Sequence, residues 1–539
     1  MQAAPPVLVH RSQPGIRWWP AQLILVLAVL GYLALFFIPH RSEQHFNIHV
    51  AQIAIYALGA LLLWGLFLSR LRWRIRWIGL GTLVGGIALL GAAFRVRGVT
   101  GNLIPILEPR WVQRNLTLPP ATAGPGTLAP TAPSPALPAL AGAADFPQFL
   151  GPTRDGILAG PRLATNWTAL PPALLWRQPM GAAWSGFVVA GSLALTQEQR
   201  GENECTVAYD LATGRAAWAH AAPARYFNTL AGEGPRATPT IRSTRVLVQG
   251  ATGLLTCLDL ASGRSLWSKD ILKENGGSLP EWGQASSPLV HNGLVIVSAG
   301  GRKDHSLAAY HLEDGSPAWA GGKQGATYSS PALRTLDGLP QIVLFTDALV
   351  GHDPENGQPL WKFPWPGGHP HVAMPVAEGG ADLIVSSGYG TGSGRVTVRR
   401  AADGTWTAKQ VWRTNRMKAK FTNLVGHGGH VYGLDDGILA CLDAADGSLR
   451  WKDGKYGHGQ VLLVGDLLLV MAESGEVVLV DPKPDQLREL TRFSALTAKT
   501  WNPPALAGQY LIARNDKEAA CFRLPLASGP AGLPFEKRP

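Results

Sequence analysis

Polar and aromatic residues recur just before short apolar stretches after residue 145, and together their side chains could bind a small molecule. They lie in segments 232–239, 281–288, 327–331, 369–375, 418–423, 456–460 and 499–504. Such residues combine hydrogen-bonding groups with flat apolar rings, as ligand sites do. The candidate binding residues are Glu233, Arg236, Trp282, Gln284, Tyr328, His371, Lys420, His458, Lys499, Trp501 and Asn502, to which an early hairpin could add Gln197, Glu198 and Arg200.

Two interpretations of these residues stay open. Lys420, Lys499 and Arg236 give the set a cationic balance, which favours an anionic ligand such as a carboxylated quinone. Alternatively, the residues line a structural channel, where they bind ordered water and hold neighbouring sheets in register. No catalytic residue is predicted, because no nucleophile has an identifiable base. No metal site is predicted either, since His427 and His430 have no third ligand nearby in the sequence.

A repeat of Asp, three residues, Gly, three residues and Trp indicates the elements that position these side chains. A short apolar strand precedes each Asp, the Asp and Gly suit a tight turn, and the Trp suits packing between neighbouring sheets. Strand, turn and strand with a period of about 40–50 residues predict a β-propeller. The repeat residues are Asp210, Gly214 and Trp218; Asp259, Gly263 and Trp267; Gly315 and Trp319, after His311; Asp353, Gly357 and Trp361; and Asp443, Gly447 and Trp451.

The number of blades follows from the outer strands. Trp176 and Trp412 extend the series of tryptophans, with spacings of 39 to 52 residues, and a last unit around residues 480–493 has no Trp. This gives eight outer strands and predicts an eight-bladed, all-β propeller. The Trp176 strand has no Asp turn before it, while the chain after Phe493 has strands without a final Trp. We therefore expect the Trp176 strand to complete the last blade and close the ring. Seven blades with a divergent end are the alternative.

Four cysteines are predicted to stay unpaired. Cys257, Cys441 and Cys521 occupy the same strand position in different repeats, so that a ring would hold them far apart. A disulfide requires Cα atoms within about 7 Å. We expect these residues and Cys205 to be buried as small apolar groups.

The repeat resembles the pyrroloquinoline-quinone (PQQ) repeat, and residues 146–156, Phe-Pro-Gln-Phe-Leu-Gly-Pro-Thr-Arg-Asp-Gly, resemble the start of bacterial PQQ-like repeat proteins. The resemblance covers about residues 146–526. It implies the propeller of quinoprotein alcohol and glucose dehydrogenases and of the outer-membrane assembly lipoprotein. The quinoprotein enzymes use PQQ with calcium and an adjacent Cys-Cys pair, which this chain does not contain. Similarity of fold alone does not establish that two proteins share an activity.

Three apolar runs before the ring, residues 21–38, 51–69 and 77–94, each approach the length of a membrane span. Arg70, Arg72, Arg74 and Arg76 lie between the second and third runs, so that the positive-inside rule places this loop in the cytoplasm. The ring would then lie on the outer side of the membrane. A cleaved signal peptide is the alternative for the first run.

The predicted organisation is a cytoplasmic N-terminus (1–20), a membrane anchor of three transmembrane helices (21–110), a linker (111–145), the propeller (146–526) and a C-terminal tail (527–539). Residues 117–144 contain seven Pro and no charge, which is typical of a semi-extended tether. Of the formal net charge of +11, a net +8 falls in residues 1–110. The basic excess therefore suits a membrane anchor, and no nucleic-acid partner is predicted.

Two functions of different classes follow. The first is a binding or scaffolding module on the periplasmic side of a bacterial inner membrane, without catalysis, which recruits a protein partner in the envelope. The second is a quinoprotein oxidoreductase that holds PQQ and calcium at the channel mouth and passes electrons to membrane quinone. The chain lacks the Cys-Cys pair, and its ring of about 380 residues lacks the long insertions that enclose the cofactor in the quinoprotein enzymes. Both features favour the first function.

Overall fold

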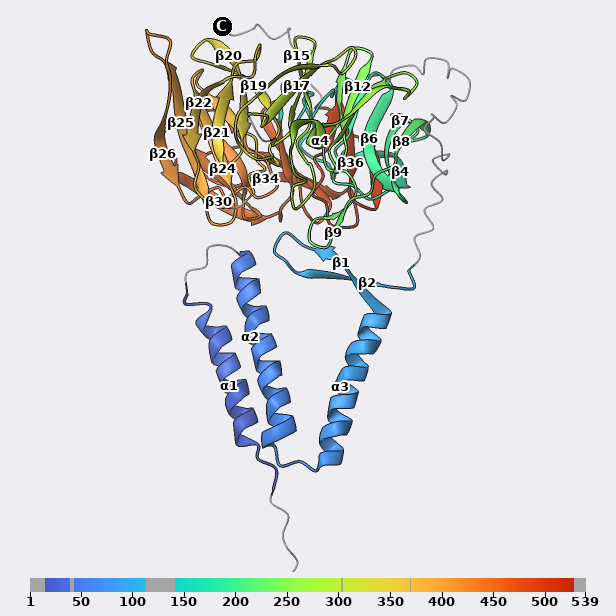
Figure 1. Ribbon diagram of the computed structural model, residues 1–539, viewed down its shortest axis with the longest axis vertical. Helices are drawn as coiled ribbons and strands as arrows, with labels where there is room; N and C mark the ends of the chain where they lie inside the picture. The colour runs from blue at the N-terminus through green and yellow to red at the C-terminus, as the bar shows by residue number, and fades with distance from the viewer. Residues whose placement is uncertain (1–14, 39–42, 113–140, 302–303, 369, 528–539) are drawn as a thin grey trace, which may run out of the picture. The chain divides into compact units, whose positions relative to one another are not determined.

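The computed structural model describes residues 15–38, 43–112, 141–301, 304–368 and 370–527. The chain divides into two compact units, Met1–Arg114 and Asn115–Pro539. The first holds apolar helices and a hairpin, and the second holds the sheets (Figure 1). Most of the predicted linker and tail, and the start of the predicted cytoplasmic segment, lie outside the described residues.

The first unit contains the predicted apolar runs as helices. Two of them, Glu43–Leu68 and Trp73–Ala93, are long and apolar enough to cross a membrane, whereas Trp19–Ala34 is a shorter apolar helix of 16 residues. The three-span anchor therefore remains a prediction. The elements are α1 (Trp19–Ala34), α2 (Glu43–Leu63), its π-helical continuation η1 (Trp64–Leu68), α3 (Trp73–Ala93), β1 (Phe94–Val99) and β2 (Pro105–Pro109).

The second unit is a ring of eight antiparallel sheets, or blades, as the repeat predicted (Figure 1). Blades 1 to 4 comprise β5 (Val188–Ala190), β6 (Leu193–Arg200), β7 (Asn203–Asp210) and β8 (Ala216–Ala222); β11 (Thr240–Arg242), β12 (Arg245–Gln249), β13 (Leu254–Asp259) and β14 (Ser265–Asp270); β15 (Leu289–His291), β16 (Leu294–Ser298), β17 (Leu307–His311) and β18 (Pro317–Gly321); and β19 (Ala332–Leu336), β20 (Leu339–Phe345), β21 (Ala348–His352) and β22 (Pro359–Pro364).

Blades 5 to 8 complete the ring. They comprise β23 (Val376–Glu378), β24 (Asp382–Ser387), β25 (Gly392–Arg400) and β26 (Trp406–Thr414); β27 (Val425–His427), β28 (His430–Asp435), β29 (Ile438–Asp443) and β30 (Leu449–Lys455); β31 (Gln460–Val464), β32 (Leu467–Met471), β33 (Glu476–Asp481) and β34 (Arg488–Ser494), with β3 (Ile157–Leu158) beside β31; and β35 (Ala505–Ala507), β36 (Tyr510–Arg514), β37 (Glu518–Arg523) and β4 (Ala173–Pro179). Three short elements lie between blades: β9 (Phe227–Asn228), β10 (Gly232–Glu233) and α4 (Ile271–Asn275).

The first strand of each blade lies nearest the axis. β5 contacts β11 and β35, β11 contacts β15, and β27 contacts β23 and β31. Because the strands of a blade alternate in direction, the loop that enters a first strand and the turn between the second and third strands lie at one end. We call this end of the ring the mouth. The Asp–Gly turns, between the third and fourth strands, lie at the opposite end.

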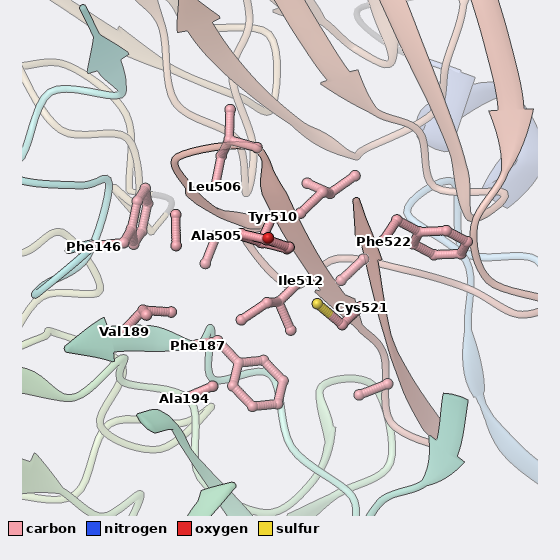
Figure 2. Close-up of a cluster of buried hydrophobic side chains, with 14 of the residues drawn as sticks. Phe146, Phe187, Val189, Ala194, Ala505, Leu506, Tyr510, Ile512, Cys521 and Phe522 are labelled. Carbon is pink, nitrogen blue, oxygen red and sulfur yellow. The ribbon is translucent and has the colours of Figure 1, made fainter. Parts of the chain in front are cut away.

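The ring closes as predicted. β4 pairs antiparallel with β37, and Cys521 lies opposite Trp176 in this register. Figure 2 shows the core at the junction, where Phe146 and Val189 from the start of the ring lie near Ala505 and Ile512 from its end. The last blade is therefore built from both ends of the propeller sequence, which confirms eight blades.

The repeated residues form the joint between blades. Asp259 accepts hydrogen bonds from the backbone N–H and hydroxyl of Ser262, at 2.9 and 2.6 Å, and Gly263 has φ +70°. A Cβ on Gly263 would lie 2.3 Å from Trp218 of the preceding blade, so that only glycine permits this contact. The same contact joins Gly214 to Trp176, Gly315 to Trp267, Gly357 to Trp319 and Gly447 to Trp412.

The indole N–H groups complete the joint. The Trp218 indole donates to Leu260 O in the next blade at 3.0 Å, and Trp176, Trp267, Trp412 and Trp451 make the equivalent bond. Trp361 precedes the longer turn at Asp403 and donates instead to Gln341 Oε1 within its own blade. The tryptophans are therefore wedges between sheets, as predicted from the repeat.

Residues 146–158, which we call the crossing segment, run across the end of the ring opposite the mouth. Pro147 O accepts from Ile241 N in blade 2 at 2.7 Å, and β3 pairs with β31 in blade 7. Arg154 donates to Pro288 O in blade 3 at 3.0 Å, and its own carbonyl accepts from Arg334 in blade 4 at 3.0 Å. Burial, with the neighbouring charge of Arg334, lowers the pKa of Arg154 to about 9. The segment therefore fastens blades far apart in the sequence.

All four cysteines are free and buried, as predicted. Cys257, Cys441 and Cys521 each lie directly opposite a wedge tryptophan on the next strand. Their common position thus reflects the need for a small apolar group beneath the indole.

Candidate functional site

Half-exposed aromatic side chains from six blades gather at the mouth, and we call them the collar. The Trp184 and Trp501 ring centroids lie 5.0 Å apart, those of Trp501 and Phe421 4.8 Å, and those of Trp282 and Tyr328 5.6 Å. The ring contacts therefore join blade 8 to blades 1 and 6, and blade 3 to blade 4. The collar consists of Trp184, Trp282, Tyr328, Tyr389, Phe421 and Trp501.

Cationic groups lie against aromatic rings of the mouth. Lys499 Nζ is 3.8 Å from the Trp501 centroid and 4.7 Å from that of Trp184, and Lys420 Nζ is 5.6 Å from that of Tyr389. Such cation–π contacts contribute about 0.5–2 kcal/mol each, depending on desolvation. The predicted residues Lys420, Lys499 and Trp501 are thus brought to one region.

Lys420 is buried beside a carboxylate. Its Nζ lies 3.3 Å from Asp436 Oδ1, and Lys418 Nζ lies 3.6 Å from Asp436 Oδ2. Burial lowers the pKa of Lys420 and raises the pKa of Asp436, although each charge favours the ionised form of the other. Asp435 forms ion pairs with Lys418 Nζ at 2.6 Å and with Lys452 Nζ at 2.9 Å. The ion-pair network of Lys420 and Asp436 therefore extends to Asp435 and Lys452.

Glu473 links two of the predicted residues. One of its oxygens accepts from the Trp501 indole at 3.0 Å, and the other accepts from the His458 backbone N–H at 2.9 Å. Burial, with the nearby charge of Lys420, lowers the pKa of His458 to about 4. The imidazole is therefore neutral near pH 7.

Arg236 and Glu204 occupy the other side of the mouth. The Arg236 guanidinium lies 4.4 Å from the Tyr226 centroid and donates to Gly232 O at 2.9 Å, and burial lowers its pKa to about 10. Glu204 accepts from Ala251 N at 3.1 Å, and burial raises its pKa to about 7.

Tight turns hold two of these side chains at the mouth. Tyr389 and Asp436 have φ of +58° and +50°, a region that non-glycine residues rarely adopt. Both lie in turns between second and third strands. A Cβ on neighbouring Gly388 would lie 2.3 Å from Lys420 Cγ, so that glycine makes room for the lysine. Asp436 and Gly437, with φ of +50° and +84°, form the two-residue Asp-Gly turn that hairpins favour.

Several predicted residues bond to or stack on groups of the same or a neighbouring blade. Glu233 lies on the β9–β10 hairpin and pairs with Arg225 at 3.0 Å. His371 stacks on Phe345, with centroids 4.5 Å apart. Asn502 donates to two carbonyls of the loop before blade 1, at 3.0 and 2.9 Å. Gln284 is buried and accepts from Gln249 Nε2 at 3.4 Å.

The further candidates near the first hairpin bond to other protein groups. Gln197, Glu198 and Arg200 belong to β6 itself. Glu198 is fully buried, where it accepts from Gly181 N at 2.6 Å and pairs with Arg200 at 2.7 Å. This network joins the mouth end of β6 to the loop before blade 1.

Sequence reasoning missed Trp184, Tyr389, Asp436 and Glu473. The segment 473–476 predicts a hairpin turn, which is correct, but the turn also presents Glu473 to Trp501. Tyr389 and Asp436 could have been found as non-glycine residues in turns that favour glycine. Trp184 precedes the first blade, so that the repeat pattern did not include it.

A calcium-bound quinone fits this mouth poorly. Calcium takes six to eight oxygen ligands, usually with several carboxylates. Among the described residues, no group of three or more His, Cys, Asp or Glu could hold a metal ion. Glu473 and Asp436 are instead engaged by Trp501, His458 and the lysines.

The eight closed blades and their Asp–Gly–Trp joints define a propeller of the PQQ-like repeat class. The sequence matches the family described as outer membrane protein assembly factor BamB over residues 171–270, 202–453 and 353–529. The chain therefore belongs to this family.

One curated relative is the outer membrane protein assembly factor BamB of Moranella endobia (strain PCIT), which is 26% identical over 257 residues. The match covers 46% of this chain and 64% of the relative, so that less than two thirds of that protein is spanned.

Two solved structures are similar to this chain at low sequence identity. A europium-containing methanol dehydrogenase has a TM-score of 0.52 and 12% identity, with 71% of this chain and 98% of that chain covered. BamB from Moraxella catarrhalis has a TM-score of 0.47 and 13% identity, with 66% and 100% covered. At 12% identity, the similarity to the methanol dehydrogenase concerns the fold alone.

Proposed function

We propose that this chain is an inner-membrane-anchored propeller on the periplasmic side of a bacterial envelope, where it binds or scaffolds a protein partner. The observation that carries this proposal is the family match, which spans most of the ring. Propellers present broad rigid faces suited to protein binding. The relatives' name, outer membrane protein assembly factor, supports a role in envelope assembly.

The first unit supports the anchor. Its helices α2 and α3 expose apolar side chains along their length, as a membrane-spanning helix does. The arginine-rich loop between them would lie in the cytoplasm. We retain the organisation of residues 1–20, 21–110, 111–145, 146–526 and 527–539 as the working domain division.

The β9–β10 hairpin is the candidate docking element. Its Phe227 is 56% exposed and Leu230 is 45% exposed, and Leu279 on the next loop is 46% exposed. Tyr226 Oη and Asn228 Nδ2 both donate to Glu281 O, which fixes the hairpin to that loop. An apolar surface held on a rigid support is suited to a protein partner.

Partner capture from membranes tests the proposal. The full chain, crosslinked in cells and purified through a tag, should recover a specific envelope protein that mass spectrometry identifies. The double variant Phe227→Asp/Leu230→Asp should reduce recovery about tenfold or more, because it places charge in the apolar contact.

Val411→Asp is the matched control, since Val411 is 50% exposed but lies on the outer strand β26. Equal recovery by both variants would reject the hairpin as the docking element. Recovery of no specific protein by the unaltered chain would reject scaffolding.

The quinoprotein oxidoreductase is the alternative, and the poor fit to calcium counts against it. Addition of PQQ and calcium to the purified protein distinguishes the two functions. Dye reduction by alcohols or sugars, together with a quinone absorbance, would establish the alternative.

A further inference from the structure

Arginine side chains gather at one end of the first unit. The backbone N–H of Arg17, just before α1, donates to Ser69 O at the end of η1 at 3.1 Å, and the Trp64 indole donates to Arg17 O at 2.9 Å. These bonds bring Arg17 to the same end as the loop between η1 and α3 (Figure 1). We call residues 17 and 69–77 the arginine end; besides Arg17, it contains Arg70, Arg72, Arg74 and Arg76.

One of these arginines has a role within the protein itself. The Arg76 guanidinium donates to Leu66 O in η1. Arg76 thereby caps this helix, whose last carbonyl groups have no partner within the helix. The side chains of Arg17, Arg70 and Arg74 are instead exposed. Helix capping therefore accounts for Arg76 but not for these three.

The carboxylates of this unit lie at its other end. Residues 1–110 contain two acidic residues, Glu43 and Glu108. Glu43 begins α2 and is therefore a whole helix away from Ser69. Glu108 lies on the hairpin after α3, where it pairs with Arg95 at 2.9 Å and with Arg97 at 3.0 Å. Among the described residues of the unit, the arginine end thus has no acidic partner, and its positive charge is available to an anion of another molecule.

Exposed tryptophans surround the same end. Trp18, Trp19, Trp73 and Trp77 are between 57% and 62% exposed, and the Trp18 and Trp64 ring centroids lie 5.6 Å apart. Tryptophan is enriched at the level of the lipid headgroups, because its ring is apolar and its N–H is polar. In a membrane, these side chains would place the neighbouring arginines at the depth of the lipid phosphates.

Arginine supplies every basic side chain of the anchor. Residues 1–110 contain ten Arg and no Lys. The positive-inside rule counts either residue, so that orientation in the membrane does not require this choice. The planar guanidinium donates two parallel hydrogen bonds to a phosphate, whereas the lysine ammonium acts as a point charge. The choice of residue therefore favours recognition of phosphate in addition to orientation.

We infer that the arginine end binds the headgroup of an anionic phospholipid in the cytoplasmic leaflet, with its phosphate on the exposed guanidinium groups of Arg17, Arg70 and Arg74. The inference rests on the membrane anchor of the proposed function and adds a lipid site to it. The site uses no residue of the propeller. Its attraction is electrostatic and exposed to solvent, so that salt weakens it.

Native mass spectrometry of the full chain in detergent tests the inference. The protein is titrated with phosphatidylglycerol, which is anionic, and with phosphatidylcholine of the same acyl chains, which has no net charge. Because a detergent micelle has no cytoplasmic side, orientation by the positive-inside rule does not affect the result. We expect phosphatidylglycerol to bind about tenfold more tightly than phosphatidylcholine, and the difference to shrink as salt is raised.

Arg70→Gln/Arg74→Gln should bind phosphatidylglycerol about tenfold more weakly and phosphatidylcholine as before, because two guanidinium groups are lost while Arg76 still caps η1. Arg70→Lys/Arg74→Lys keeps both charges and should have an intermediate affinity. Arg215→Gln/Arg264→Gln is the matched control, since it removes the same charge from exposed turns of blades 1 and 2. This control should bind both lipids like the unaltered protein. Circular dichroism and thermal unfolding verify that each variant is folded.

Equal binding of the two lipids by the unaltered protein would overturn the inference. So would an affinity for phosphatidylglycerol that folded Arg70→Gln/Arg74→Gln retains. Full affinity in the lysine variant would overturn recognition through paired hydrogen bonds.

Carbonate washing of cell membranes tests the anchor separately. Release of the full chain would overturn both the anchor and the lipid site, whereas retention together with equal binding of the two lipids would overturn the lipid site alone. The Phe227→Asp/Leu230→Asp variant should bind phosphatidylglycerol normally, so that a failure of the scaffolding proposal remains distinguishable from a failure here.

Discussion

At the scale of residues, Glu204 and His458 have opposite effects on the pH dependence of folding. Burial raises the pKa of Glu204 from 4.5 to about 7 and lowers that of His458 from 6.5 to about 4. Protonated Glu204 is favoured in the fold, so that its contribution is complete below about pH 4.5 and is lost as pH rises through 7. Neutral His458 is favoured, so that its contribution is lost as pH falls below 6.5.

Glu204→Gln should remove one of these effects. The amide still accepts from Ala251 N but does not ionise. We expect the free energy of unfolding of the variant, relative to the unaltered ring, to rise by about 3 kcal/mol between pH 4.5 and 7.5. Urea denaturation of residues 141–539 at both pH values measures this change.

Glu355→Gln, in an exposed turn, is the control for loss of one negative charge. A stability difference for Glu204→Gln that does not vary with pH would contradict the buried, protonated state.

At the scale of elements, the joint between blades depends on a glycine contact that propensity alone does not reveal. Gly263 has a positive φ, which a turn requires, and it also has no room for a Cβ beside Trp218. Gly465 has a φ of +57° but nothing within 4 Å of its Cβ position. Substitution of these two glycines by alanine therefore separates the cost of backbone strain from the cost of overpacking against Trp218.

Gly263→Ala should cost about 2–4 kcal/mol, because strain of about 1 kcal/mol adds to overpacking of about 1–3 kcal/mol. Gly465→Ala should cost only about 1 kcal/mol. Urea denaturation of both variants gives the difference. Equal losses would show that Trp218 moves aside without cost.

At the scale of the whole molecule, the ring is held closed by sequence that precedes its first blade. β4 supplies the outer strand of blade 8, and the crossing segment binds blades 2, 3, 4 and 7. Without these residues, β37 would become an exposed edge.

A chain that begins at residue 141 should fold as a soluble ring, because it keeps the closing strand and lacks the apolar helices. A chain that begins at residue 180 should lose cooperative unfolding and expose β37 to rapid hydrogen exchange. Calorimetry and hydrogen exchange compare the two. A shared transition temperature would mean that β4 does not contribute to closure.

The candidate site was predictable only in part. Lys420, His458, Lys499 and Trp501 belong to a predicted set and do meet at the mouth, since each precedes a first strand. Tyr389, Asp436 and Glu473 come from turns between other strands, which a search for loops before first strands does not cover. Glu233 and Asn502 occupy the expected loops, but Glu233 pairs with Arg225 and Asn502 bonds to the loop before blade 1, because loop conformation decides where a side chain points.

The sequence by itself determined the blades, their number and their closure, because these depend on local turns and on one residue spacing repeated along the chain. It determined that the cysteines stay apart for the same reason. Only the tertiary structure decided which side chains share the mouth, and that the crossing segment joins distant blades at the other end. Such contacts join residues from separate blades, and their geometry depends on how the closed ring orients every loop around one axis.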